Sequence, residues 1–296
     1  MIRFSPFVLA IVALCVLPFG GCGGRGGSRA LIQNKGSDTL VNVAQAWAEA
    51  YKTVNPEVAV AVSGGGTGTG ISALLNGTVD IANASRKLKA KEIEAAKAKG
   101  VNPVQWIVGY DALAVFIHKD NPKKQYTFEE LAAIYGEGGD VDQWSDIGVT
   151  VPGCDSSEIV RVSRQNNSGT YVYFKDTILG KKKDYKLGSR DMHGSKDVVD
   201  LVEKTPCAIG YSGLAYATDH IGVAAISPDG KQPYVQPSVA TASDGTYPIA
   251  RPLLMYTNGE PTGKVKAYLD WILSKEGQDI LQEKGYAPGP PGGKAP

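Results

Sequence analysis

The fold is decided by a stretch in the first third of the chain, VAVAVSGGGTGTGISALLNGTVDIA, residues 58–82. It starts as a β-rich run, passes through a glycine loop at 64–70, continues as a helix over 71–75 and returns to a short strand at 79–82. A strand, a helix and a second strand in close succession are typical of a mostly parallel sheet. We therefore predict helices on both faces of that sheet, with ligands bound where strands end and helices begin.

The same alternation continues on both sides of this stretch. Residues 41–54 place Val43, Trp47 and Tyr51 on one stripe, which predicts an amphipathic helix. A strong strand at 112–117 is broken at 118–122, and a second unit of strands and helices follows it. After about residue 250 the chain returns to an apolar strand and to one long helix over 264–284.

We expect two α/β lobes, with mixed sheets flanked by helices and a cleft between the lobes. The first lobe would comprise residues 31–118 and 251–287, and the second residues 119–250. The Pro/Gly-rich tail at 288–296 is expected to be disordered.

Composition narrows the classes of function. The 296 residues are 43% hydrophobic and 21% charged, with a net charge of +1, which describes an ordinary globular chain. Nucleic-acid or membrane-surface binding favours a clustered basic face, and a near-neutral balance argues against such partners.

The first 22 residues read as a targeting segment. Arg3 supplies the positive start, residues 7–17 the apolar stretch, and Gly20-Gly21 the small residues before Cys22. The pattern resembles a bacterial lipoprotein signal cleaved before Cys22, although Phe19 stands where leucine is usual. Residues 23–30 would then be a flexible tether to a membrane-anchored lipid. The alternative is a plain secretory signal with an incidental cysteine.

Two further cysteines, Cys154 and Cys207, remain after the signal. In the oxidising compartment outside the cytoplasm, such a pair suggests one disulfide. The alternative is two buried free thiols.

Three strand-to-helix junctions share one composition. They are GSDT at 36–39, GTGTG at 66–70 and NSGT at 167–170. Each puts hydroxyls and glycine at a helix N-terminus, where unpaired N–H groups and the helix dipole attract an anion. Arg164 precedes the third junction, and its planar guanidinium could bind an oxyanion through two N–H groups.

Any one of these junctions could equally be an ordinary helix cap, because Ser, Thr and Gly are common there. Three in one exported two-lobed chain are more specific. The glycine loop also lacks the lysine of a P-loop and the spacing of a dinucleotide fingerprint.

At these junctions the chain resembles the phosphate-binding proteins of bacterial phosphate ABC transporters, the PstS family. The resemblance runs from about residue 31 to 284. The motifs that resemble the family are GSDT at 36–39, the glycine loop at 65–70, DIANASR at 80–86, YDALAV at 110–115, RQNNSGT at 164–170 and IGY at 209–211.

The resemblance implies the type II periplasmic-binding-protein fold, a hinged two-lobed clamp that buries one phosphate and needs no cofactor or metal. It also implies a monomer that delivers phosphate to a membrane permease. Thr39 and the Leu40 N–H correspond to ligands from the first helix, and Thr67 takes the place of a binding serine. The second-lobe ligands match at Arg164, Ser168, Gly169 and Thr170. Further candidates are Ser37, Asp38, Thr69, Ser85, Arg86 and Asp111.

Two departures from the family pattern matter. Arg86 stands where the best-known members have an aspartate that accepts the hydrogen of protonated phosphate, and it resembles a shorter branch with Ala-Ser-Arg. Asn166 replaces a carboxylate. Arg86 could pair with the anion or with a neighbouring carboxylate. Asp38 is our first candidate for the missing acceptor of the phosphate hydrogen, although it could instead cap the N-terminus of its helix. Asp111 is the second candidate, and its alternative role is to fix the hinge between the lobes.

Enzyme classes find little support in the sequence. The three histidines, His118, His193 and His220, lie in no recognisable triad motif, and no paired metal-ligand spacing occurs. The chain is therefore expected not to be an enzyme. The remaining alternatives are a binding protein for sulfate, molybdate or arsenate, or a phosphate sensor without a transporter.

Overall fold

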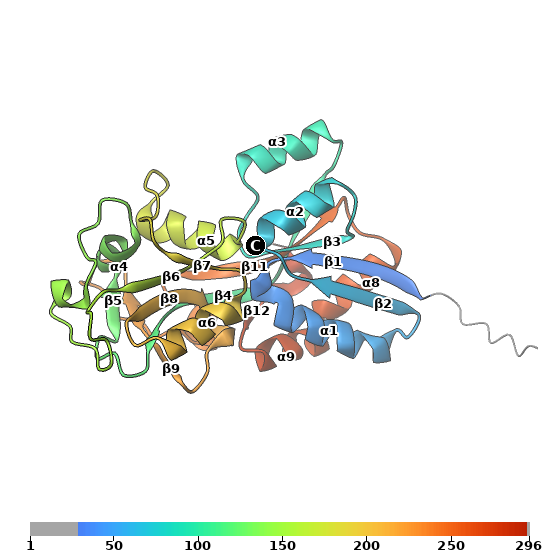
Figure 1. The fold of residues 1–296 in the computed structure, drawn as a ribbon. Helices are drawn as coiled ribbons and strands as arrows, with labels where there is room; N and C mark the ends of the chain where they lie inside the picture. The colour runs from blue at the N-terminus through green and yellow to red at the C-terminus, as the bar shows by residue number, and fades with distance from the viewer. Residues whose placement is uncertain (1–28, 295–296) are drawn as a thin grey trace, which may run out of the picture.

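The computed structural model describes residues 29–294, which form two α/β lobes that meet at one crossing (Figure 1). The predicted two-lobed fold is confirmed. The expected signal at 1–22, Cys22 and most of the tether at 23–30 lie outside the described residues, and the first strand already starts at Ala30.

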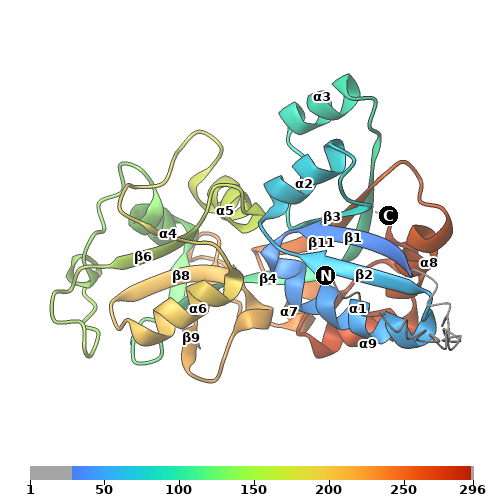
Figure 2. The same ribbon diagram turned by 45° about the vertical axis from the view of Figure 1, so that its right-hand side comes forward.

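The first lobe holds the two ends of the chain that the structure describes. Its strands are β1 (Ala30–Gly36), β2 (Val58–Ser63), β3 (Ile81–Ala84), β11 (Ala250–Asn258) and β12 (Ala287–Pro288). Its helices are η1 (Asp38–Leu40), α1 (Val41–Val54), α2 (Thr67–Leu75), α3 (Ala90–Ala98), α8 (Gly263–Ile272), α9 (Lys275–Glu283) and η5 (Pro291–Gly293). Figure 2 shows α3 standing above α2 at the edge of this lobe.

The second lobe is formed by the middle of the chain. Its strands are β5 (Gln125–Thr127), β6 (Val160–Arg164), β7 (Arg190–Met192), β8 (Ala208–Gly213), β9 (Ile221–Val223) and β10 (Ala225–Ser227). Its helical elements are α4 (Phe128–Tyr135), η2 (Trp144–Ile147), α5 (Gly169–Phe174), the π-helix η3 (Lys175–Leu179), α6 (Ser195–Lys204), η4 (Leu214–Tyr216) and α7 (Val239–Ser243).

One long strand, β4 (Pro103–His118), belongs to both lobes. The main sheet has the order β2-β1-β3-β11-β4-β8-β6-β7, and β1 pairs in parallel with both β2 and β3. Residues 103–112 of β4 pair with β11, whereas residues 113–117 pair with β8 of the second lobe. The boundary expected at residue 118 is therefore displaced, because the chain crosses between lobes inside β4.

The helix predicted over residues 41–54 is confirmed as α1. Its stripe of Val43, Trp47 and Tyr51 is buried in the first-lobe core. The Trp47 indole N–H also donates to the Gly277 carbonyl at 2.7 Å, which fixes α9 against α1. A separate aromatic core fills the second lobe, where the rings of Phe174 and Tyr211 stack with centroids 3.9 Å apart.

The C-terminal region differs from expectation in two ways. The single helix predicted over 264–284 is two helices, α8 and α9, because the Ser274 hydroxyl caps a new start by accepting the Gly277 N–H. The tail was expected to be disordered from Pro288. Up to Lys294 it instead packs on β4, where β12 pairs with Tyr110 and Gly109, and Gly293 is buried.

Cys154 and Cys207 are joined by a disulfide in the second lobe, with their Cα atoms 5.0 Å apart. Among residues 29–294, no helix combines the length and the apolar character needed to cross a membrane.

Candidate functional site

The three glycine- and hydroxyl-rich junctions meet at the boundary between the lobes. The hydroxyls of Thr39 in η1 and Thr170 in α5 lie 3.1 Å apart, although 131 residues separate them. At the start of α2, the Gly68 N–H donates to the Asn167 carbonyl at 2.9 Å. Helix starts from both lobes therefore converge on one point, as the strand-to-helix alternation predicted.

A chain of buried hydroxyls connects these junctions. The Ser37 hydroxyl donates to Ser85 at 2.8 Å, and the Ser85 hydroxyl lies 3.5 Å from that of Thr67. The Ser85 N–H also donates to Thr67 at 3.1 Å. All three side chains are buried, and each follows the carboxyl end of β1, β2 or β3.

Gly169 lets the second lobe approach these hydroxyls. A Cβ atom at this position would lie 2.4 Å from both the Ser85 and the Thr67 hydroxyl oxygens, far inside van der Waals contact. Gly66 has a similar role on the other side, since its φ of +88° suits glycine and a Cβ there would lie 2.9 Å from the Asn167 carbonyl oxygen. These two glycines allow backbone from opposite lobes to meet.

Arg164, the last residue of β6, is fully buried at this meeting point. Its guanidinium donates to the Ser195 hydroxyl at 3.0 Å, to the His193 carbonyl at 2.7 Å and to Asp38 at 3.2 Å, and its Nε donates to the Met192 carbonyl at 3.4 Å. Burial lowers the pKa of Arg164, and the Asp38 carboxylate opposes that decrease. With four of the five N–H groups engaged, two-point binding of an anion by this guanidinium is not available in this arrangement.

Asp38 links the lobes through one carboxylate oxygen and its backbone carbonyl. Oδ2 accepts from Arg164 of the second lobe, and Oδ1 accepts the Gly65 N–H of the glycine loop at 2.9 Å. The backbone carbonyl of Asp38 accepts the Tyr216 hydroxyl at 2.6 Å. Asp38 is the first residue of η1, whose N-cap position is Ser37, so the N-cap alternative is not seen.

Arg251 is a site residue that the sequence analysis missed. It lies in β11 at the crossing, directly opposite Asp111 in β4, and both side chains are almost fully buried. The Arg251 Nη2 donates to Asp111 at 2.8 Å and also to the hydroxyls of Thr39 at 3.3 Å and Thr170 at 3.0 Å. A charged side chain in a buried strand is unusual unless it is paired, and this was the available signal.

Asp111 therefore lies behind Arg251 and not among the hydroxyls. Its Oδ2 accepts two N–H groups of Arg251, at 2.8 and 3.0 Å. Burial raises the pKa of Asp111, and the Arg251 guanidinium opposes the rise. Of the two roles considered, its position at the crossing fits the hinge.

Several other candidates serve local structure. The Leu40 N–H, expected to face the anion, donates to the Ser37 carbonyl at 3.1 Å. The Ser168 hydroxyl caps α5 by accepting the Thr170 N–H at 3.1 Å. Thr69 lies at the edge, where its hydroxyl accepts from the Asn167 amide at 3.4 Å.

Arg86 pairs with a neighbouring carboxylate. Its two Nη atoms donate to the two carboxylate oxygens of Glu92 in α3, at 2.7 and 2.8 Å. Although burial acts to raise it, the pKa of Glu92 is lowered by the hydrogen bonds from Arg86. Of the two alternatives for Arg86, the structure shows the pairing with a neighbouring carboxylate.

We call the cradle the buried group that remains, which consists of Ser37, Asp38, Thr39, Thr67, Ser85, Arg164, Gly169, Thr170 and Arg251. It offers hydroxyl donors, two guanidinium groups and one carboxylate acceptor, a combination suited to a small oxyanion that carries a proton. Within residues 29–294, no group of three or more His, Cys, Asp or Glu side chains is placed to hold a metal ion.

Comparison with known proteins gives a consistent result. A model of the PBP superfamily domain matches residues 23–276. The phosphate-binding protein PstS of Pseudomonas aeruginosa is 36% identical over 271 residues, which cover 88% of this chain and 83% of that protein. The PstS protein of Bacillus subtilis is 32% identical over 86% of this chain and 79% of its own length.

Solved structures agree with these matches. A proposed phosphate ABC transporter substrate-binding protein from Clostridium perfringens, determined with bound phosphate, superposes with a TM-score of 0.77. It is 29% identical and covers 88% of this chain and 100% of its own. The fold is therefore shared with a solved protein that was determined with bound phosphate.

Proposed function

Because the chain belongs to the PBP superfamily and, within it, to the PstS phosphate-binding proteins, we propose that it binds inorganic phosphate outside the cytoplasm and delivers it to a phosphate ABC importer. The observation that supports this most strongly is the cradle, where buried hydroxyls from both lobes converge beside two guanidinium groups. Such groups can replace the water molecules that surround a small anion in solution.

The positive and negative charges at the cradle are balanced, and this determines how an anion can be bound there. Arg164 is paired with Asp38, and Arg251 with Asp111. A dianion entering this site gains little from net charge, so affinity rests on directed hydrogen bonds from hydroxyls, backbone N–H groups and the remaining guanidinium hydrogens. Micromolar affinity requires about 8 kcal/mol, which several buried hydrogen bonds to a charged ligand can provide.

Asp38 is the proposed acceptor for the phosphate hydrogen. It is the carboxylate in contact with the principal arginine, and its Oδ2 is held there by a single interaction at 3.2 Å. Hydrogen phosphate offers a proton to a carboxylate, whereas sulfate, which is fully ionised, would meet it with like charge. This repulsion is the physical basis proposed for selecting phosphate.

Closure of the lobes accompanies binding in this proposal. The chain passes between the lobes within β4 and again where it enters β11, and the Asp111–Arg251 pair connects these two strands at the crossing. Arg251 contacts Thr39 of the first lobe and Thr170 of the second, so the hinge touches both halves of the cradle. A ligand that binds both lobes stabilises the closed state over the open one.

The remaining parts of the proposal concern the setting of the protein. We propose that it acts as a monomer, carries a lipid on Cys22 and catalyses no reaction. The cleavage pattern before Cys22 supports the anchor, and the three histidines, which lie in no recognisable triad motif, support the non-catalytic role.

The proposal is tested by titrating purified, phosphate-stripped protein with phosphate in a calorimeter, in the presence and absence of excess sulfate. One phosphate per chain should bind, and sulfate should compete weakly. Binding of sulfate with equal affinity would favour a general oxyanion carrier. Release of product from a chromogenic phosphate ester would contradict the non-catalytic role.

A further inference from the structure

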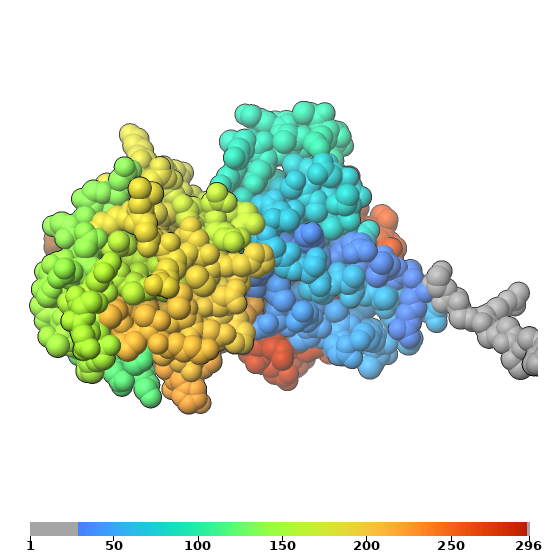
Figure 3. Space-filling view, in the orientation of Figure 1, coloured from blue at the N-terminus to red at the C-terminus, as the bar shows by residue number. Residues whose placement is uncertain are grey.

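A groove of about 580 Å³ lies between the lobes beside the cradle. Residues 85–90 of the first lobe line one side, and residues between Val172 and Lys181 of the second lobe line the other. Ser85 and Arg251 belong to both the groove and the cradle, so the two adjoin. Figure 3 shows a notch on the surface between the α3 region and the lobe that carries α5.

This interlobe groove carries unbalanced positive charge. Lys87, Lys89 and Lys181 line it, and none of them forms an ion pair with a residue in the described range 29–294. Asp176 is its one carboxylate among the described lining residues. A second hollow of about 560 Å³ shares Lys89, Lys181 and Asp176 with the groove and adds Lys91. The whole chain has a net charge of only +1, so this excess is local.

A buried and a partly buried cation in the groove wall, Arg86 and Lys89, lie side by side. Arg86 is 8% exposed, and its Nε has no hydrogen-bond partner among the described residues although both Nη atoms bind Glu92. Burial and then the neighbouring Arg86 lower the pKa of Lys89. Glu92 and Asp176 oppose this decrease, but the lysines of the groove outnumber its one unpaired carboxylate, and such an excess of cations favours an anionic ligand.

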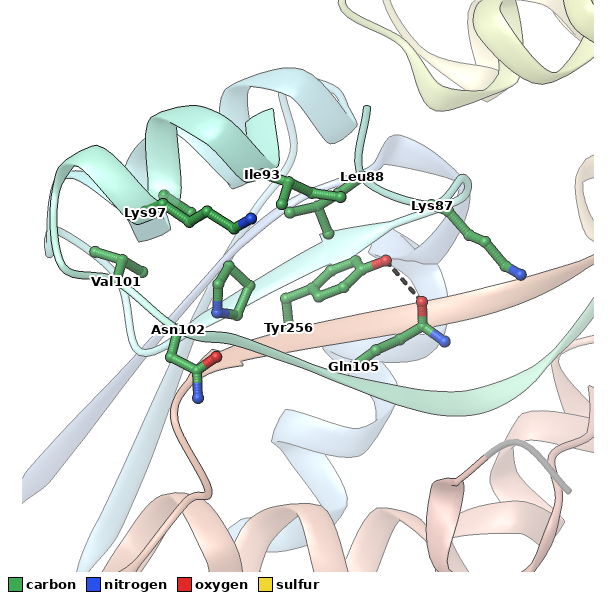
Figure 4. Close-up of a pocket in the computed structure, with 10 residues that line it drawn as sticks. Lys87, Leu88, Ile93, Lys97, Val101, Asn102, Gln105 and Tyr256 are labelled. Carbon is green, nitrogen blue, oxygen red and sulfur yellow. Dashed lines mark hydrogen bonds between the residues drawn. The ribbon is translucent and has the colours of Figure 1, made fainter. Parts of the chain in front are cut away.

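The groove differs from the pocket drawn in Figure 4. That pocket, of about 400 Å³, lies beneath α3 and is lined mostly by apolar groups such as Leu88, Ile93 and Tyr256. The Tyr256 hydroxyl in it donates to Gln105 at 2.9 Å. Lys87 lines both the groove and this pocket, and Figure 4 shows its side chain extending away from the other labelled side chains.

We propose that the interlobe groove is a second anion site, and that it binds condensed inorganic phosphates such as tripolyphosphate. Three to four unpaired lysines around a short groove match a ligand that concentrates several negative charges on adjacent phosphoryl groups. A chain of phosphoryl groups can contact Lys89 and Lys181 together, and so bind the closed protein while phosphate occupies the cradle.

The test uses the full protein saturated with phosphate, titrated with tripolyphosphate in a calorimeter. One tripolyphosphate should bind per chain, without displacing phosphate and with affinity that decreases as salt is added. The double variant Lys89→Gln/Lys181→Gln should weaken tripolyphosphate about tenfold or more and leave the phosphate Kd unchanged. The matched control is Lys204→Gln/Lys231→Gln, which removes two exposed lysines elsewhere and should change neither affinity.

Three results would overturn the second site: no binding of tripolyphosphate, equal weakening in both double variants, or displacement of phosphate by tripolyphosphate. Glycerol 3-phosphate, which carries one phosphoryl group, should bind much more weakly, and equal binding would contradict the charge argument. Failure of the proposed function is separate, because it would appear as absent phosphate binding in the unaltered protein.

Discussion

Replacing Asp38 by asparagine separates the two effects that this carboxylate has on a bound anion. In the structure its Oδ2 lies 3.2 Å from the Arg164 Nη2, and its Oδ1 accepts the Gly65 N–H at 2.9 Å. The Asp38→Asn change keeps an oxygen for Gly65 but removes the negative charge. At 3.2 Å and an effective dielectric constant of about 20, the Coulomb interaction with Arg164 is about 5 kcal/mol before desolvation is counted.

The phosphate affinity alone is an ambiguous readout of this variant. Removing a carboxylate relieves repulsion for any anion, whereas only hydrogen phosphate loses a proton acceptor. A hydrogen bond to a charged group contributes about 1.5–3 kcal/mol, so the ratio of phosphate to sulfate affinity should fall about 10- to 150-fold. Calorimetric titration of both anions measures this ratio directly.

The control for this experiment is Asp80→Asn. Asp80 also accepts a backbone N–H, that of Gln33 at 2.7 Å, but it lies outside the cradle. Its substitution should leave the ratio unchanged. In Asp38→Asn the amide nitrogen would face Arg164, so thermal unfolding should show some loss of stability in a folded protein. An unaltered phosphate-to-sulfate ratio in folded Asp38→Asn would refute the acceptor role.

Three further predictions concern the pairs around the cradle. Arg164→Ala should weaken phosphate about 100-fold or more while circular dichroism still reports a folded chain, and near-normal affinity would exclude this arginine from the site. Glu92→Gln leaves a buried arginine without its partner and should destabilise the protein by about 1–3 kcal/mol in denaturant unfolding, with an unchanged phosphate Kd. The pKa of Glu92 in the folded protein is lowered from 4.5, so its contribution to stability is present above pH 4.5 and is lost as the pH falls through the folded pKa. The unaltered protein should therefore lose more stability in acid than Glu92→Gln. The Cys154→Ser/Cys207→Ser variant should lose about 2–4 kcal/mol of stability and keep its phosphate affinity; equal stability of the two forms would contradict a structural role for the bond.

The parts of the site that lie at chain junctions were predictable from the sequence. Glycine and hydroxyl residues before a helix, as at Thr39, Thr67 and Thr170, follow from local chemistry, and the parallel sheet brings strand ends to one edge. Their convergence to within 3.1 Å for Thr39 and Thr170 depends on how the lobes close, which local patterns predict only in outline.

Arg251 was not predictable in the same way. It lies near the start of an apolar strand, between Ala250 and Pro252, with no glycine or hydroxyl beside it. Its role comes from the register of β11 on β4, which sets it against Asp111 across 140 residues of sequence. Pairing over such a distance is decided by tertiary structure.

Two choices left open by the sequence also depended on tertiary contacts. Arg86 could have faced the anion, but α3 brings Glu92 within hydrogen-bond distance of both its Nη atoms. The tail after Pro288 is rich in glycine and proline, yet β12 and the buried Gly293 pack it against β4. In both cases the conformation depends on a contact that the local sequence pattern does not determine.

The most direct measurement is a crystal structure of the phosphate-saturated protein. Our account predicts one phosphate enclosed between the lobes, within hydrogen-bond distance of Arg164, Thr39, Thr67 and Thr170, with its protonated oxygen against Asp38. A phosphate bound elsewhere on the chain, with the Arg164–Asp38 pair unchanged and no cradle hydroxyl in contact, would contradict it.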